Sequence, residues 1–125
     1  MADEFPDDLK DFIRKHIHSV AQLEILLMLR KEPERTWTAD EVTNSLYLQS
    51  EMVTQMLKDI SQRGFAVETQ GRFRYQPAND TDRRLIDRLA QVYQERRVAV
   101  ITAIFSKPID FIKAFADAFR LRKEE

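Results

Sequence analysis

Residues 37–75 contain the strongest structural signals in the chain, because helix and hairpin patterns follow one another closely in WTADEVTNSLYLQSEMVTQMLKDISQRGFAVETQGRFRY. Thr38 and Glu41 have the Ser/Thr-x-x-Glu spacing of a capping box, in which each side chain bonds a free backbone N–H of a new helix. This spacing predicts a helix over about 38–47. Leu48-Gln49 then forms a tight turn.

The second half of the same stretch predicts another helix and a hairpin. Ser50 can cap a helix that ends near Arg63, and Gly64 supplies the left-handed residue that often ends a helix. Two runs of alternating apolar and polar residues then lie on either side of Gln70-Gly71. Alternation around X-Gly predicts a β-hairpin with a tight turn, and Pro77 ends it.

Two helices are expected before this stretch. Apolar residues spaced by three and four predict an amphipathic helix over about 6–18, with Pro6 in its first turn. Ser19 and Gln22 form a second capping pattern, and the helix that follows stops at Pro33. Its residues are apolar nearly all round, which predicts a buried central helix.

Two more helices are expected after the hairpin. Helical spacing of apolar residues continues without a break from about residue 80 to 105. A helix of this length measures about 39 Å, whereas a domain of this size has a radius of gyration of only about 14 Å. We therefore expect this helix to project or to pack against something else. A last amphipathic helix is predicted over 108–122.

The order of these elements, with a β-prone piece at 35–37, resembles bacterial winged helix-turn-helix transcriptional regulators of the MarR-like kind. The likeness covers residues 19–77 and rests on Leu46-Tyr47-Leu48, Arg63-Gly64-Phe65 and the hairpin. It implies a mainly α fold with a small β-hairpin (α+β). The winged helix-turn-helix core would lie in one domain, 1–125, between flanking helices in 1–18 and 78–125.

In such regulators the helix after the turn enters the major groove of DNA, and the hairpin, or wing, contacts the flanking backbone. Here these are residues 50–63 and 69–75. Gln55 has the chemistry to pair with adenine, and Lys58 to bind guanine or phosphate. An ordinary solvated helix face explains the same side chains equally well. The candidate DNA contacts are Ser50, Glu51, Thr54, Gln55, Lys58, Gln62, Arg72 and Arg74.

The charge of the chain leaves DNA binding open. Twenty basic and 21 acidic residues give a net charge of -1, and the isoelectric point is about 6.2. Residues 36–77 carry four basic and five acidic groups. DNA-binding modules are usually basic. A winged helix that binds another protein, as a scaffold or adaptor, is therefore the alternative function.

Several kinds of chemistry are disfavoured by the composition. The chain has no cysteine and only two glycines, which excludes thiolate chemistry and glycine-rich phosphate loops. On the helix predicted over 6–18, His16 and His18 would point about 200° apart, which is unsuitable for a shared metal ion. No motif such as Gly-x-Ser-x-Gly positions a side chain as a catalytic nucleophile. We expect no enzymatic activity, no cofactor and no metal.

Two further features of the sequence predict where in the cell the protein is found. The N-terminus, Met1-Ala2-Asp3-Glu4, is acidic and does not have the pattern of a signal peptide. No run of about 20 apolar residues could cross a bilayer. We therefore expect a cytoplasmic protein without a membrane partner.

Four of the eight phenylalanines lie between residues 105 and 119. They could pack on the core of their own chain, or they could form a two-fold dimer interface that matches a two-fold operator. We favour a homodimer. A cavity among them could hold a small apolar effector, although a filled core is the simpler expectation, and the sequence identifies no effector. The candidate dimerisation residues are Phe105, Phe111, Ile112, Phe115 and Phe119.

Overall fold

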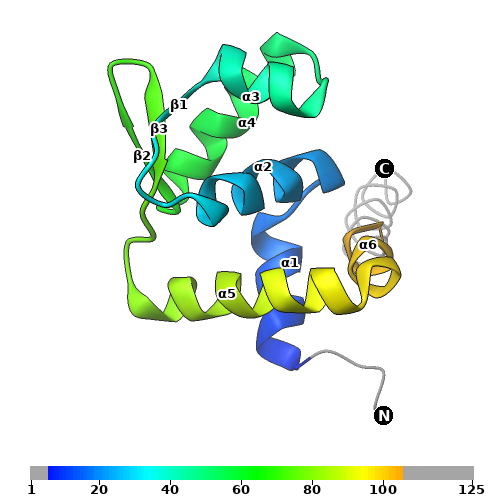
Figure 1. Cartoon of the computed structure of the whole chain (residues 1–125). Helices are drawn as coiled ribbons and strands as arrows, with labels where there is room; N and C mark the ends of the chain where they lie inside the picture. The colour runs from blue at the N-terminus through cyan, green and yellow to red at the C-terminus, as the bar shows by residue number, and fades with distance from the viewer. Residues whose placement is uncertain (1–5, 106–125) are drawn as a thin grey trace, which may run out of the picture.

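Six helices and a small antiparallel sheet build residues 6–105, the part of the chain that the computed structural model describes (Figure 1). This is the predicted mainly helical α+β fold of the winged-helix type. The elements are α1 (Asp7–His16), α2 (Val20–Lys31), β1 (Trp37–Thr38), α3 (Ala39–Leu46), α4 (Ser50–Gln62), β2 (Ala66–Thr69), β3 (Arg72–Tyr75), α5 (Asp80–Glu95) and α6 (Arg97–Phe105).

The predicted hairpin is confirmed, and β1 completes it as a third strand. The strand order is β1-β3-β2, with Trp37 opposite Phe73. The hairpin turn places Gln70 and Gly71 at φ 53° and 80°. Two successive left-handed residues make the strands cross with the right-handed twist that a two-residue hairpin needs.

The α2 helix forms the centre of the core, as its apolar sequence predicts. Leu23, Ile25, Leu26 and Leu29 are all fully buried on it. Figure 1 shows α3, α4 and the sheet on one side of α2, with α1 and α5 on the other. Buried residues of all six helices and the sheet belong to one hydrophobic cluster.

The predicted N-terminal caps can be compared with the structure at the starts of α2, α3 and α4. Thr38 and Glu41 form the full reciprocal capping box at the start of α3. At α2, the Ser19 hydroxyl accepts from the Gln22 backbone N–H, but the Gln22 side chain accepts from His18 instead of closing the box. At α4, the prediction that Ser50 is the cap is wrong. Ser50 is already the first helical residue, and the capping position is Gln49, whose side chain makes no cap hydrogen bond.

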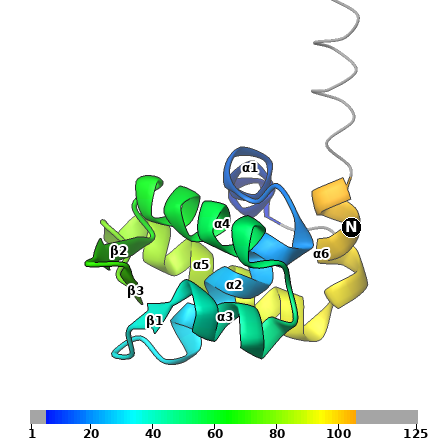
Figure 2. The same ribbon diagram turned by 90° about the horizontal axis from the view of Figure 1, so that it is seen from above.

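The prediction of one helix over 80–105 is also wrong. The chain breaks at Arg96, at φ -138° and ψ 59°, and α6 turns away from the axis of α5 to pack beside α1 (Figure 2). This turn buries Val100 and Ile104, which a straight helix would leave in water. The expectation of a projecting 39 Å helix therefore fails.

Within residues 6–105, no helix is both long enough and apolar enough to cross a membrane.

Candidate nucleic-acid interface

The outer face of α4 is polar and accessible along its whole length. Val53, Leu57 and Ile60 are buried against the core, and this fixes which side of the helix points outward. Thr54 is half-buried, and its hydroxyl donates to the Ser50 carbonyl oxygen at 2.9 Å, so that hydroxyl is already engaged within the helix. The exposed side chains of this face are Ser50, Glu51, Gln55, Lys58 and Gln62.

The two arginines of the hairpin share one exposed face of β3, opposite the buried Phe73 and Tyr75. The Arg72 guanidinium donates to the Thr36 hydroxyl at 3.3 Å, and that of Arg74 donates to the Gln76 side-chain oxygen at 2.6 Å. Both of these partners are uncharged. The positive charge of the wing thus has no carboxylate in contact with it among the described residues.

The hairpin follows α4 closely because the chain turns sharply at Gly64, where φ is 87°. Phe65 N–H donates to the Ile60 carbonyl, and Ala78 N–H donates to the Gly64 carbonyl, so both ends of the hairpin are tied to the end of α4. Figure 1 shows the hairpin tip and the turn between α3 and α4 above α2 and away from α5, at opposite ends of α4. The structure therefore places the wing next to the C-terminal end of α4.

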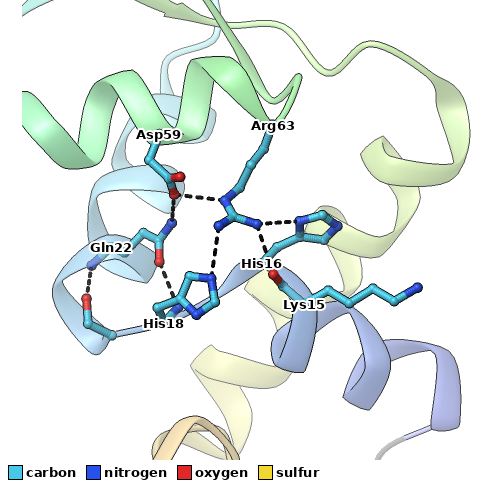
Figure 3. Close-up of polar contacts among 7 residues, drawn as sticks. Lys15, His16, His18, Gln22, Asp59 and Arg63 are labelled. Carbon is cyan, nitrogen blue, oxygen red and sulfur yellow. Dashed lines mark hydrogen bonds and ion pairs between the residues drawn. The ribbon is translucent and has the colours of Figure 1, made fainter.

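A polar cluster centred on Arg63 holds the C-terminal end of α4 (Figure 3). The guanidinium donates to Asp59 at 2.8 Å and to the Lys15 carbonyl oxygen at 2.9 Å. It also lies 3.0 Å from His16 Nδ1 and 2.9 Å from His18 Nε2.

Gln22 extends this cluster to the central helix. Its side-chain amide donates to the same Asp59 oxygen at 2.8 Å, and it is a buried polar residue of the core. The Arg63 cluster, which consists of Lys15, His16, His18, Gln22, Asp59 and Arg63, therefore joins α1, the α1–α2 connection, α2 and α4.

The two histidines accept hydrogen bonds from a cation, so the nitrogen that faces Arg63 must be unprotonated in each. For His16, desolvation and then the Arg63 charge lower the pKa below its ordinary value. The expectation that the two imidazoles point apart is wrong. The α1 helix ends at His16, and Ile17 is extended, so both rings converge on one guanidinium.

The sequence contained one signal for this cluster, the i, i+4 spacing of Asp59 and Arg63 on α4. Nothing in the local pattern linked Arg63 to residues 45 to 48 positions earlier. No group of three or more His, Cys, Asp or Glu side chains within residues 6–105 is arranged to hold a metal ion.

A shallow groove of about 310 Å³ lies beside the outer face of α4, between this helix and the α1–α2 connection. Met52 and Met56 supply its apolar part, and Gln55 reaches it from the outer face. The remaining lining residues are His18, Ser19, Gln22 and Asp59.

Phe105 is the one candidate dimerisation residue that the structure describes. It is 71% exposed at the end of α6, and Val98 on the same helix is 76% exposed. Phe111, Ile112, Phe115 and Phe119 lie outside the described residues.

No protein-family model matches this chain, and comparisons with curated proteins and with solved structures find no match either.

Proposed function

We propose that this chain is a DNA-binding transcriptional regulator of the winged-helix type. The observation that carries the proposal is that a hairpin with two exposed arginines adjoins the end of α4, a helix whose outer face is polar and accessible. An α-helix fits the major groove, whose base edges carry a readable pattern of donors and acceptors. In this mode Gln55 and Lys58 contact bases. The Glu51 carboxylate either repels a nearby phosphate or accepts a hydrogen bond from the amino group of cytosine.

The wing supplies the part of the affinity that does not depend on sequence. Arg72 and Arg74 bond only neutral partners, so each can exchange a weak local contact for a phosphate. Each phosphate that a cation neutralises releases bound counterions, which makes the affinity fall as salt rises.

We further propose that the regulator is a homodimer in the cytoplasm, with no catalytic role. Val98, Ile101, Thr102 and Phe105 follow one another at i, i+3, i+4 and i+7, so they form one stripe along α6. Val98, Thr102 and Phe105 are exposed, and Ile101 is half-buried. A second copy would remove this mostly apolar stripe from water and would present two α4 helices to a two-fold operator.

A salt titration tests DNA binding directly. Fluorescence anisotropy with a labelled duplex of mixed sequence is measured between about 50 and 200 mM salt, the range over which phosphate contacts weaken strongly. The double change Arg72→Gln and Arg74→Gln should reduce the slope of log affinity against log salt by up to about 1.8, or about 0.9 for each lost contact.

Arg84→Gln is the matched control, because Arg84 is an exposed arginine on α5, which lies on the opposite side of α2 from the hairpin tip. It should leave the slope unchanged. An unchanged slope in the wing variant would remove the wing from the mechanism.

The second candidate function is a protein-binding adaptor. The methionine-lined groove beside α4 and the net negative charge of residues 36–77 favour it. An adaptor should bind no duplex even at the lowest salt, so the same titration separates the two functions.

A further inference from the structure

Tyr47, in the turn between α3 and α4, combines a costly backbone conformation with an exposed aromatic ring. Its dihedral angles are φ 57° and ψ 43°, in the left-handed region, and its side chain is 92% exposed. Bulky residues rarely occupy this region, which suits glycine or asparagine. Strained residues of this kind concentrate at sites of function.

The turn does not need the tyrosine side chain in order to close. The Tyr47 backbone N–H donates to the Thr43 carbonyl, and the Leu48 N–H donates to the same oxygen at 3.3 Å. Leu46 and Leu48 pack against the core on either side of the turn. The Tyr47 ring therefore stays exposed while its neighbours pack on the core. A glycine at this position would adopt the same left-handed backbone conformation with less strain.

We propose that the Tyr47 hydroxyl donates a hydrogen bond to a phosphate of the DNA backbone and so positions the start of α4 in the major groove. The inference rests on the proposed function. When a helix-turn-helix docks, its first helix crosses the backbone and the N-terminal residues of the second contact base edges. The turn between them lies next to the phosphates, and tyrosine is among the side chains that bond phosphate oxygens.

A neutral donor suits this position. Glu51 lies in the first turn of α4, directly after the α3–α4 connection, whereas the acidic residues of α3, Asp40 and Glu41, lie at the far end of that helix. A phenol hydroxyl bonds a phosphate without displacing a counterion, so this contact has a different salt signature from that of the wing arginines. It should add affinity on every DNA sequence and leave the salt slope unchanged.

Two variants of the full chain test the proposal by anisotropy on the same mixed-sequence duplex. Tyr47→Phe removes only the hydroxyl and should weaken binding about tenfold, the usual order for a hydrogen bond to a charged group, with an unchanged salt slope. Tyr47→Gly removes the ring and relieves the backbone, so it should bind at least as weakly as Tyr47→Phe and should melt no lower than the wild type.

Tyr75→Phe is the matched control, since the Tyr75 hydroxyl is buried without a hydrogen-bond partner in the described structure. This variant should bind DNA as the wild type does. Wild-type affinity in both Tyr47 variants would overturn the proposal while leaving DNA binding intact, and so would a salt slope that falls in Tyr47→Phe. If the wild type binds no duplex at low salt, the proposed function fails, and the role of Tyr47 fails with it.

Discussion

Replacing Arg63 by methionine tests whether the Arg63 cluster fixes α4 on the rest of the fold. Methionine keeps much of the length of the side chain but has no donor. The substitution leaves the Lys15 carbonyl, His16 Nδ1 and His18 Nε2 without the donor that now serves them. It also leaves Asp59 with Gln22 as its remaining partner in the cluster.

The expected cost follows from the number of contacts and their exposure. Arg63 makes four hydrogen bonds in the cluster, and each is worth a net ~0.5–1.5 kcal/mol. The Arg63 and Asp59 side chains are 24% and 37% exposed, so water replaces part of what is lost. We expect about 2 kcal/mol of destabilisation, which lowers the melting temperature of a chain of this size by about 8 °C.

The loss should also depend on pH, because His16 is held neutral in the folded state. Its pKa lies below the ordinary value through desolvation and the Arg63 charge, with smaller contributions from Lys15 and His18, while Asp82 acts in the opposite direction. A lowered histidine pKa means that the folded state binds fewer protons than the unfolded state. The stability contribution is therefore complete above about pH 6.5 and is lost as the pH falls through the folded pKa.

Thermal melts at pH 7 and pH 5.5 measure both effects. In Arg63→Met the repulsion from the guanidinium is gone but the desolvation stays, so stability should fall less steeply with acid than in the wild type. The difference in melting temperature between the wild type and Arg63→Met should therefore be smaller at pH 5.5 than at pH 7. Arg84→Met, at an exposed site on α5, should change stability by less than about 0.5 kcal/mol. A variant as stable as this control, or a stability difference that widens in acid, would show that the Arg63 cluster does not hold α4.

Three further predictions concern caps, turns and association. Thr38→Ala removes one half of the capping box at α3 and should cost about 1 kcal/mol in chemical denaturation. Gly64→Ala and Gly71→Ala should each cost about 1–2 kcal/mol, because both glycines have positive φ, and at neither position would the new Cβ meet an atom closer than ordinary van der Waals contact. Replacing Val98 and Phe105 by serine should shift the mass measured by light scattering from dimer to monomer, and an unchanged mass would exclude the α6 stripe from the dimer interface.

Local chemistry explains why much of this fold could be predicted from the sequence. The capping box at Thr38, the left-handed Gly64 and the Gln70-Gly71 turn depend on a few adjacent residues, and each forms as expected. The outward face of α4 was predictable for a similar reason, because the spacing of its buried residues fixes which side points to solvent.

The features that the sequence did not reveal depend on residues far apart in the chain. No glycine or proline marks the break at Arg96. The corner is instead held by Glu24 of α2, which accepts from the Tyr93 hydroxyl at 2.8 Å and from Arg97 at 3.1 Å. A pattern with helical spacing on both sides of such a corner predicts one straight helix. The Arg63 cluster was missed because the periodicity extended the first helix to residue 18, whereas α1 ends at His16 and His18 lies in the connection that follows.

This correction changes the basis of the proposed dimer. The expected length of a single helix over 80–105 no longer argues for a partner, since α6 covers α1 of its own chain. The exposed stripe that contains Val98 and Phe105 remains as the argument, and it lies on the side of α6 that this packing leaves in solvent.

Each end of α4 carries a feature that burial of its apolar face does not require. At the C-terminal end, Arg63 bonds to α1 and the α1–α2 connection, although Val53, Leu57 and Ile60 already seat the helix on the core. At the N-terminal end, Tyr47 keeps a conformation that a glycine would adopt at less cost. A helix that served only to fill the core would need neither feature. A helix that must present its outer face at a fixed angle to a rigid partner would benefit from both, which is what the major groove of DNA demands.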